Sequence, residues 1–455
     1  MITNTLPLFI FEESPIFLNG EMGLYDAIIS EYEQIESNLS INYLLDKVTY
    51  TSPVNFNESM RTARHRWFSY KEGFSPSFVR SYLNEFCSKS SNILDPFAGV
   101  GTTLLEASRL GHTAYGFEVS PMSYEIAQTK ALSWEKEDFL ELDSCIEVFT
   151  KKQFDETASI PNNQTVISYY DPDYLKSLLC IKAFYLSVEN EKIKSLFKLA
   201  FLNCLEKYST HRKAGNGLKK KSNLTYIDLF EKPIEQIRQT VLGDLKKFKG
   251  DAEKEPAIAN MHLKHGSCLD EKLYPEHIQF DAVLTSPPYA NCFDYSKIYM
   301  IELWLGDYFS STDSQKTFRQ HSLRSHVHAR WQERNTEYGS EIVDNLIFKF
   351  LSEQKLWSSQ IPNMIKGYFN DMGKLLHLLS KYCRSGAVVG LVVGNSYYGS
   401  LPIATDLLLT AISDQFGFEP LRIDVYRNTI VSSQQFTQAL TKKYMRESLV
   451  ILRKT

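Results

Sequence analysis

The sequence lacks paired cysteines, long apolar runs and any excess of basic residues. Its seven cysteines are scattered and none forms a CxxC pair, which argues against a disulfide framework or a zinc site and is typical of free thiols in a reducing compartment. No stretch approaches the ~20 apolar residues of a membrane span, and residues 1–17 lack the basic lead of a secretory signal. These absences predict a cytoplasmic protein without a membrane partner.

The charge balance sets a condition on any nucleic-acid partner. The chain carries 50 Lys and Arg against 54 Asp and Glu, a formal net charge of -4, so DNA binding requires a local concentration of cations. Basic residues gather at 211–223, at 318–334 and at Arg61, Arg64 and Arg66. Charge runs are usually solvated faces, but we predict that some of these residues contact phosphate, and we favour the first segment, which we interpret as a basic loop with two glycines. The candidates are Arg212, Lys213, Lys219, Lys220, Lys221, Arg324 and Arg330.

The chain is long enough for two or three domains, or for one domain with large insertions. Residue patterning divides it into an N-terminal extension (1–60), a cofactor-binding part (61–130), a helical insertion (131–262) and a second catalytic part (263–455) that contains another candidate for DNA contact (306–360). Strong 3.6-residue periodicity predicts helices within 174–208 and 233–248. Helices are also predicted at 341–383, with a break at Pro362.

One βαβ unit is evident in "NILDPFAGVGTTLLEASRLGHTAYGFEVSP", which predicts an open α/β sheet. Asp95 stands at the end of its first strand and Glu118 at the end of its second. Such sheets bind ligands at this edge, and Gly99 and Gly101 let the chain turn close to a ligand. A dinucleotide fingerprint would need a third glycine at position 104, which is absent, so a dehydrogenase is disfavoured.

The two carboxylates indicate a nucleoside ligand with a cationic tail. Glu118 can accept two hydrogen bonds from a ribose diol. Asp95 can reach the amino-acid end of a ligand such as S-adenosylmethionine (SAM). Either residue alone would more often cap a turn or end a strand, so the prediction rests on the whole constellation.

A second site is marked by "TSPPY" at the end of another apolar strand. Pro287 and Pro288 end strand pairing abruptly because proline has no N–H and a fixed φ. A hydroxyl, on Ser286, precedes them and an aromatic ring, on Tyr289, follows. A strand that stops in this way suggests a site.

Together, "DPFAGVGTT" and "TSPPY" resemble the motifs of the DNA amino-methyltransferases, which methylate cytosine at N4 or adenine at N6. "RWFSYKEGFSPSFVRSYL" resembles the accessory SAM-binding segment of that family, "HGSCLD" the segment whose acid faces the SAM adenine, and "GLVVGNSYYGSLPIATD" a later sheet-edge motif. The resemblance implies an α/β, Rossmann-like methyltransferase fold with a mostly parallel sheet, helices on both faces and a helical insertion. The residues predicted to hold SAM are Tyr70, Phe74, Ser75, Asp95, Pro96, Phe97, Ala98, Gly99, Gly101, Thr102, Glu118 and Asp270.

The resemblance assigns catalysis to Ser286, Pro287, Pro288 and Tyr289. An exocyclic amine is a poor nucleophile because its lone pair is delocalised into the ring, so hydrogen-bond acceptors must draw that pair back onto nitrogen. A backbone carbonyl held rigid by the prolines and the Ser286 hydroxyl suit this task. The amine is inaccessible inside a duplex, so the base must be flipped out, and Tyr289 is its predicted stacking partner.

We therefore predict a site-specific methyltransferase of double-stranded DNA, set by family analogy in a restriction–modification system that would pair it with a cognate restriction endonuclease. In the family, Ser-Pro-Pro-Tyr leans towards cytosine N4 and Asp-Pro-Pro-Tyr towards adenine N6. Cytosine C5 is disfavoured because no cysteine follows a proline. The alternatives are adenine N6, then an RNA amine, then a non-catalytic DNA-recognition subunit. Base recognition is placed in 131–262, in 306–360, or in both.

No metal is predicted. His321, His326 and His328 invite a metal interpretation, but their spacing fits no common site and no cysteine lies near them.

Overall fold

The computed structural model describes residues 23–44, 54, 56–71, 73–88, 90–224, 231–255, 258–329, 337–429 and 443–455. Strands occur in both halves of this part of the chain. They are β1 (Ile41–Tyr43), β2 (Asn92–Asp95), β3 (Thr113–Glu118), β4 (His211–Ala214), β5 (Gly217–Lys220), β6 (Met261–His265), β7 (Phe280–Thr285), β8 (Cys383–Gly394), β9 (Ser396–Tyr398), β10 (Leu401–Ile403), β11 (Phe418–Asn428) and β12 (Arg446–Lys454).

Eight of these strands form one sheet in the order β1-β11-β12-β8-β7-β2-β3-β6. Neighbours are parallel, except that β12 is antiparallel to both β8 and β11. The strand β2 therefore lies between β3 and β7, and the carboxyl ends of all three meet at one edge. The predicted mostly parallel, Rossmann-like sheet is confirmed.

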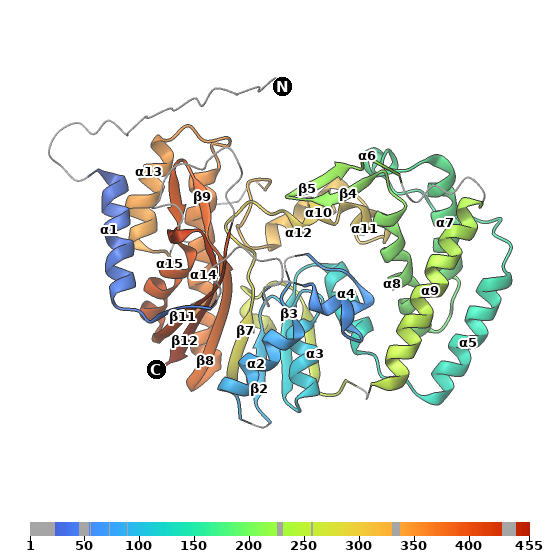
Figure 1. Ribbon diagram of the computed structural model, residues 1–455, viewed down its shortest axis with the longest axis horizontal. Helices are drawn as coiled ribbons and strands as arrows, with labels where there is room; N and C mark the ends of the chain where they lie inside the picture. The colour runs from blue at the N-terminus through green and yellow to red at the C-terminus, as the bar shows by residue number, and fades with distance from the viewer. Residues whose placement is uncertain are drawn as a thin grey trace, which may run out of the picture.

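Helices cover the sheet and build a second lobe beside it (Figure 1). The α-helices are α1 (Leu24–Ser37), α2 (Pro76–Phe86), α3 (Thr102–Arg109), α4 (Pro121–Ala131), α5 (Lys136–Lys151), α6 (Gln164–Ile167), α7 (Pro172–Leu186), α8 (Glu191–Lys207), α9 (Pro233–Lys254), α10 (Tyr295–Ile298), α11 (Met300–Leu305), α12 (Thr312–His321), α13 (Phe348–Glu353), α14 (Ile361–Tyr382) and α15 (Thr405–Ser413). Short 3-10 segments are η1 (Glu58–Arg61), η2 (His65–Trp67), η3 (Glu271–Leu273) and η5 (Asp414–Phe416), and η4 (Ile342–Ile347) is π-helical.

Successive side chains along each strand point to opposite faces of the sheet. In β2, Ile93 packs with α2 and α3, whereas Leu94 packs with α14 and α15 on the opposite face. In β12, Leu449 and Val450 divide in the same way. Both faces are buried, which explains why the central strands read as apolar runs in the sequence.

The second lobe is the helical insertion. Its helices α5, α7, α8 and α9 share one apolar core with α11, and they stand together on the right of Figure 1. The basic segment at 211–223, expected as a loop, instead forms the antiparallel hairpin β4–β5. Two-residue hairpins need positive φ in the turn, and Gly215 supplies it with φ +56°.

Two further segments bear on their sequence pattern. The helices predicted over 341–383 are interrupted between the end of α13 at Glu353 and the start of α14 at Ile361, and Pro362 stands in the first turn of α14, where its missing N–H costs nothing. The described part of the N-terminal extension joins the sheet, since β1 pairs with β11. Among the described residues, no helix is long and apolar enough to span a bilayer.

Candidate functional site: a cavity at the carboxyl edge of β2, β3 and β7

A cavity with about 1000 Å³ of empty space opens where β2, β3 and β7 end. It is lined by the loops that follow these strands and by the segment before α2. Most residues predicted to hold SAM line it, namely Tyr70, Phe74, Asp95, Pro96, Phe97, Ala98, Gly99, Thr102 and Glu118. This is the edge at which open α/β sheets bind ligands.

Asp95 is buried at the end of β2. Its Oδ1 accepts hydrogen bonds from Thr285 Oγ1 at 2.6 Å and from the Phe97 backbone N–H at 3.1 Å. Burial raises the pKa of Asp95 to about 6, against the opposing effect of these bonds. The carboxyl group is therefore fixed in place, and a cationic ligand group would favour its ionised form.

Glu118 is buried at the end of β3, and both of its oxygens are oriented by the backbone. Oε2 accepts the Gly99 N–H and Oε1 the Ser120 N–H, each at 2.7 Å. Burial raises the pKa of Glu118 to about 8. Each carboxylate oxygen has a second lone pair, so the group can still accept hydrogen bonds from a ribose diol.

The loop between these two acids depends on glycine. Gly101 has φ +85° and directly precedes α3, and a Cβ there would stand 3.1 Å from the Ala127 Cβ. Gly99 has φ +53°, and a Cβ there would lie 3.4 Å from the Tyr70 ring, which lines the cavity. Both residues thus let the loop turn beneath an aromatic wall.

Three of the residues predicted to hold SAM have other positions. Ser75 caps α2, with its Oγ accepting the Phe78 N–H at 3.2 Å. Gly101 is not among the residues that line the cavity, but its positive φ lets the loop turn. Asp270 is exposed and caps η3, so it does not line the cavity; Ser267 and Cys268 line it instead. The "HGSCLD" segment reaches the cavity, but by different residues from the one that we predicted.

The four residues of the Ser-Pro-Pro-Tyr motif divide between two faces. Ser286 and Pro288 line the cavity together with Asp95 and Glu118. Tyr289 lines a small adjoining pocket with Ser286 and Pro287. Its hydroxyl donates to Glu447 Oε1 at 2.7 Å, and a Cβ on Gly394 would stand 2.7 Å from its ring. The Tyr289 ring is therefore held against the end of β8, beside the cavity.

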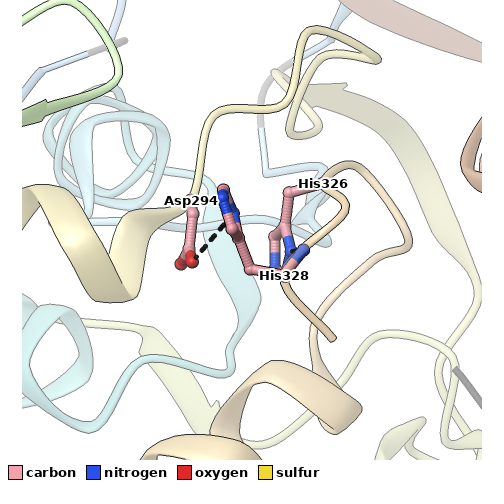
Figure 2. A group of neighbouring side chains, drawn as sticks. All are labelled: Asp294, His326 and His328. Carbon is pink, nitrogen blue, oxygen red and sulfur yellow. Dashed lines mark hydrogen bonds and ion pairs between the residues drawn. The ribbon is translucent and has the colours of Figure 1, made fainter. Parts of the chain in front are cut away.

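The cavity continues past Ser286 to Asp294 and His326. Figure 2 shows Asp294, His326 and His328 as one group, whose ligand-type atoms lie within 4.8 Å of one another. Burial lowers the pKa of His326 to about 4, so its imidazole is neutral at pH 7. No sequence pattern indicated Asp294, which lies beyond the motif and far from both histidines in the chain.

This group has the residue types of a metal site, but the charge of Asp294 is already neutralised by Arg319. Asp294 Oδ2 lies 2.9 Å from the Arg319 guanidinium, and Oδ1 accepts from Ser296 N and Oγ at 2.9 and 2.6 Å. A divalent cation would have to displace Arg319 and face its charge. The donor set therefore fits a carboxylate–guanidinium pair better than a metal.

The predicted phosphate-binding residues fall into two groups. Lys213 is buried between Glu206 and Glu302, Lys221 donates to three backbone carbonyls at the end of α8, and Arg324 is buried against Asp371 at 2.7 Å. These three stabilise the fold, which weighs against our prediction that they contact phosphate. Arg212, Lys219 and Lys220 are exposed on the β4–β5 hairpin, and Arg330 lies outside the described residues.

A mostly parallel sheet whose carboxyl edge carries a buried aspartate, a glycine turn and a buried glutamate around one cavity is typical of the class of SAM-dependent methyltransferases. Residues 31–129 match a family model described as DNA methylase. The chain is 30% identical over 487 aligned residues to the type II methyltransferase M.AvaI of Nostoc sp., with 97% of each protein covered. It therefore belongs to the family of DNA amino-methyltransferases that act on N4 or N6 and include the type II methyltransferases, and SAM is its methyl donor.

Two further matches have lower sequence identity. The type II methyltransferase M.BsoBI of Geobacillus stearothermophilus is 27% identical, over 88% of this chain and 87% of its own. Among solved structures, an rRNA methylase from Streptococcus thermophilus aligns with 83% of this chain and 95% of its own at 9% identity and a TM-score of 0.29.

Proposed function

We propose that the protein transfers a methyl group to N4 of a cytosine that has been flipped out of duplex DNA. One observation carries this proposal. Ser286 and Pro288 line the same cavity as Asp95 and Glu118, so an amine beside Ser286 shares its space with the proposed SAM position. Ser286 in place of an aspartate favours cytosine over adenine, as the family pattern suggests.

The residues of this chain provide positioning and hydrogen-bond acceptors. SAM supplies an electrophilic methyl group on a sulfonium. The Ser286 hydroxyl and a backbone carbonyl of the proline pair accept hydrogen bonds from the two N–H groups of the target amine. These bonds localise the lone pair of the amine on its nitrogen. With SAM held beside Asp95 and Glu118, the amine nitrogen would be positioned to accept its methyl group, leaving S-adenosylhomocysteine, and the methylated nitrogen would release one proton to water. Holding both reactants in one cavity supplies much of the rate.

We propose that the exposed cations of the β4–β5 hairpin hold the DNA. The Asn216 side chain, in the turn of this hairpin, donates to the Asn291 carbonyl at 3.3 Å, two residues after Tyr289. Arg212, Lys219 and Lys220 therefore lie on a hairpin that touches the catalytic loop, where phosphates next to an extruded base would pass. In the cell, we propose that the enzyme works in the cytoplasm in restriction–modification, beside a cognate endonuclease.

The test is to incubate the protein with methyl-labelled SAM and mixed-sequence duplex DNA, digest the DNA to nucleosides and identify the labelled one. We expect N4-methylcytosine. Label in N6-methyladenine would show that the target base is adenine and would leave the enzyme class unchanged. Label only in added RNA, or in no nucleic acid, would overturn the proposal. Asp95→Ala and Ser286→Ala are the controls, and both should lose most activity with the fold intact.

A further inference from the structure

A second, larger cleft lies beside the catalytic cavity. It has about 1140 Å³ of empty space, part of it open to solvent. Its walls come from the segment around α6, the hairpin strand β5, and the helices α10 to α12. In Figure 1 these elements gather on one side of the molecule, above α4 and α8. The cleft therefore lies between the helical insertion and the segment that follows the catalytic loop.

The chemistry of this cleft is unusual for a protein whose net charge is -4. None of the described residues that line it is acidic. Four carry side-chain amides and two carry long cationic side chains, and these are Asn162, Asn163, Gln164, Gln315, Lys297 and Arg319. Asn and Gln amides offer a donor and an acceptor together, the pair that matches a base edge in a groove, whereas sites that bind only phosphate are dominated by cations.

The rim of the cleft carries polar side chains that make no hydrogen bond to the described part of the protein. Asn162, Gln164 and Thr165 are exposed, and within the described part of the chain their side chains make no hydrogen bond to protein. On the opposite wall, Gln315 reaches Ser296 Oγ only at 3.4 Å. These groups are held by short, ordered elements yet remain available to a ligand.

The floor, in contrast, is rigid and is coupled to the catalytic cavity. Arg319 Nε donates to Ser296 Oγ at 2.9 Å, and its guanidinium lies 2.9 Å from Asp294 Oδ2. Arg319 lines the cleft, whereas Asp294 lines the catalytic cavity. One ion pair thus forms the wall between the two spaces. The units next to one that occupies the cavity would therefore be within reach of the cleft.

We propose that this cleft reads the base pairs that flank the target base, through hydrogen bonds from its amides to base edges. The inference rests on the proposed function, because a flanking site has meaning only when a base occupies the cavity. It assigns sequence recognition jointly to the helical insertion, through Gln164, and to the segment after the catalytic loop, through Gln315. The exposed hairpin cations hold the backbone and carry no sequence information.

The experiment compares the wild-type enzyme with the variant Gln164→Ala/Gln315→Ala on a pool of duplexes with randomised positions around the target base. Methylated duplexes are sequenced and the preference at each flanking position is measured. We expect the variant to lose about tenfold or more of the preference at one or two positions. Gln34→Ala, an exposed glutamine on α1 at the far end of the molecule (Figure 1), is the matched control and should keep the wild-type preference.

Two results would overturn the inference. One is an unchanged sequence preference in the double variant. The other is an equal loss of activity on all sequences, which would assign the cleft to backbone contacts alone. SAM affinity, measured in the same preparations, must remain at the wild-type value, which shows that the variant is folded. If the wild-type enzyme methylates no DNA, the proposed function itself fails, and that outcome is distinct from an active enzyme whose preference does not respond.

Discussion

Thr285 donates a 2.6 Å hydrogen bond from its Oγ1 to Oδ1 of Asp95. The bond joins the last residue of β7 to the last residue of β2, two neighbouring parallel strands. Ser286 follows Thr285 directly, so one side chain links Asp95, which we propose to face SAM, to the hydroxyl that we propose to face the target amine. Methyl transfer depends on the separation of these two sites, and this bond is one of the contacts that sets it.

Replacing Thr285 with valine should weaken SAM binding. Valine keeps the shape of the side chain but removes the donor, and a hydrogen bond to a charged group is worth about 1.5–3 kcal/mol. We expect the Kd for SAM at pH 7 to rise about tenfold, with a smaller effect at pH 8.5, where Asp95 is ionised in both proteins. Isothermal titration calorimetry measures this. Thr410→Val, which removes another buried hydroxyl that bonds only to a backbone carbonyl, should leave the Kd unchanged.

SAM affinity should increase as the pH rises from 6 to 8.5. In the free protein, burial raises the pKa of Glu118 from 4.5 to about 8, so the carboxyl group holds its proton below that pH. A cationic ligand whose ribose donates hydrogen bonds favours the ionised form. The raised pKa also means that the free protein loses stability as the pH rises from 4.5 to about 8, and bound SAM should restore it.

The measurement is the increase in Tm caused by SAM, which should be larger at pH 8.5 than at pH 6. Glu118→Gln cannot ionise and should flatten this dependence while it lowers affinity overall. An equally steep pH dependence in Glu118→Gln would show that another group, such as the ligand's own amine, is responsible.

The placement of the residues that we propose to hold SAM could be predicted from the sequence because its determinants are local. Asp95, Gly99, Gly101 and Glu118 lie within one βαβ unit, and the parallel arrangement brings strand ends to one edge whatever the rest of the chain does. Asp270 shows the limit of this reasoning. A motif position predicted its role, but the side chain caps η3, and local capping of this kind competes with ligand contact for any short acid.

The basic residues could not be sorted from the sequence because their partners are distant in the chain. Lys213 and Lys219 belong to one basic run, yet only Lys213 meets Glu302, which lies 89 residues further on. Alternation along β4 and β5 turns neighbouring side chains to opposite sides, and tertiary packing decides which side meets an acid. The same argument applies to Asp294 and Arg319, whose pairing follows no helix or strand period.

Tyr289→Phe and Tyr289→Ala should have different effects. Phenylalanine keeps the ring but loses the bond to Glu447, whose other oxygen pairs with Arg427. We expect a stability loss of about 1 kcal/mol and nearly full activity. Alanine removes the ring that we propose to stack on the extruded base and should lower the rate of methyl transfer at least tenfold. Single-turnover kinetics with saturating SAM measures this rate, and full activity in Tyr289→Ala would remove the stacking role.

Substitutions of the lysines in the β4–β5 hairpin should have two different effects, one on stability and one on DNA affinity. Lys213→Met leaves Glu302 buried without its cation, and breaking a buried pair costs about 3–5 kcal/mol. We expect a clear fall in the midpoint of urea unfolding. Lys219→Gln/Lys220→Gln, at exposed positions, should leave that midpoint unchanged. Its DNA affinity should instead fall, and the slope of log K against log salt should become shallower by about 2, one per lost phosphate contact. An unchanged slope would move the DNA path away from the hairpin.

Chelators should not affect the enzyme, even though Asp294, His326 and His328 are gathered as ligands for a metal would be. Arg319 already neutralises Asp294, and a cation entering the group would face the guanidinium. Methyl transfer rates before and after EDTA treatment should therefore agree within about twofold, and added Zn²⁺ should not inhibit. In Arg319→Gln the positive charge is gone, while both imidazoles remain neutral and able to bind metal. Zn²⁺ should then inhibit this variant and EDTA should reverse the inhibition, whereas loss of wild-type activity on chelation would assign the group to a metal after all.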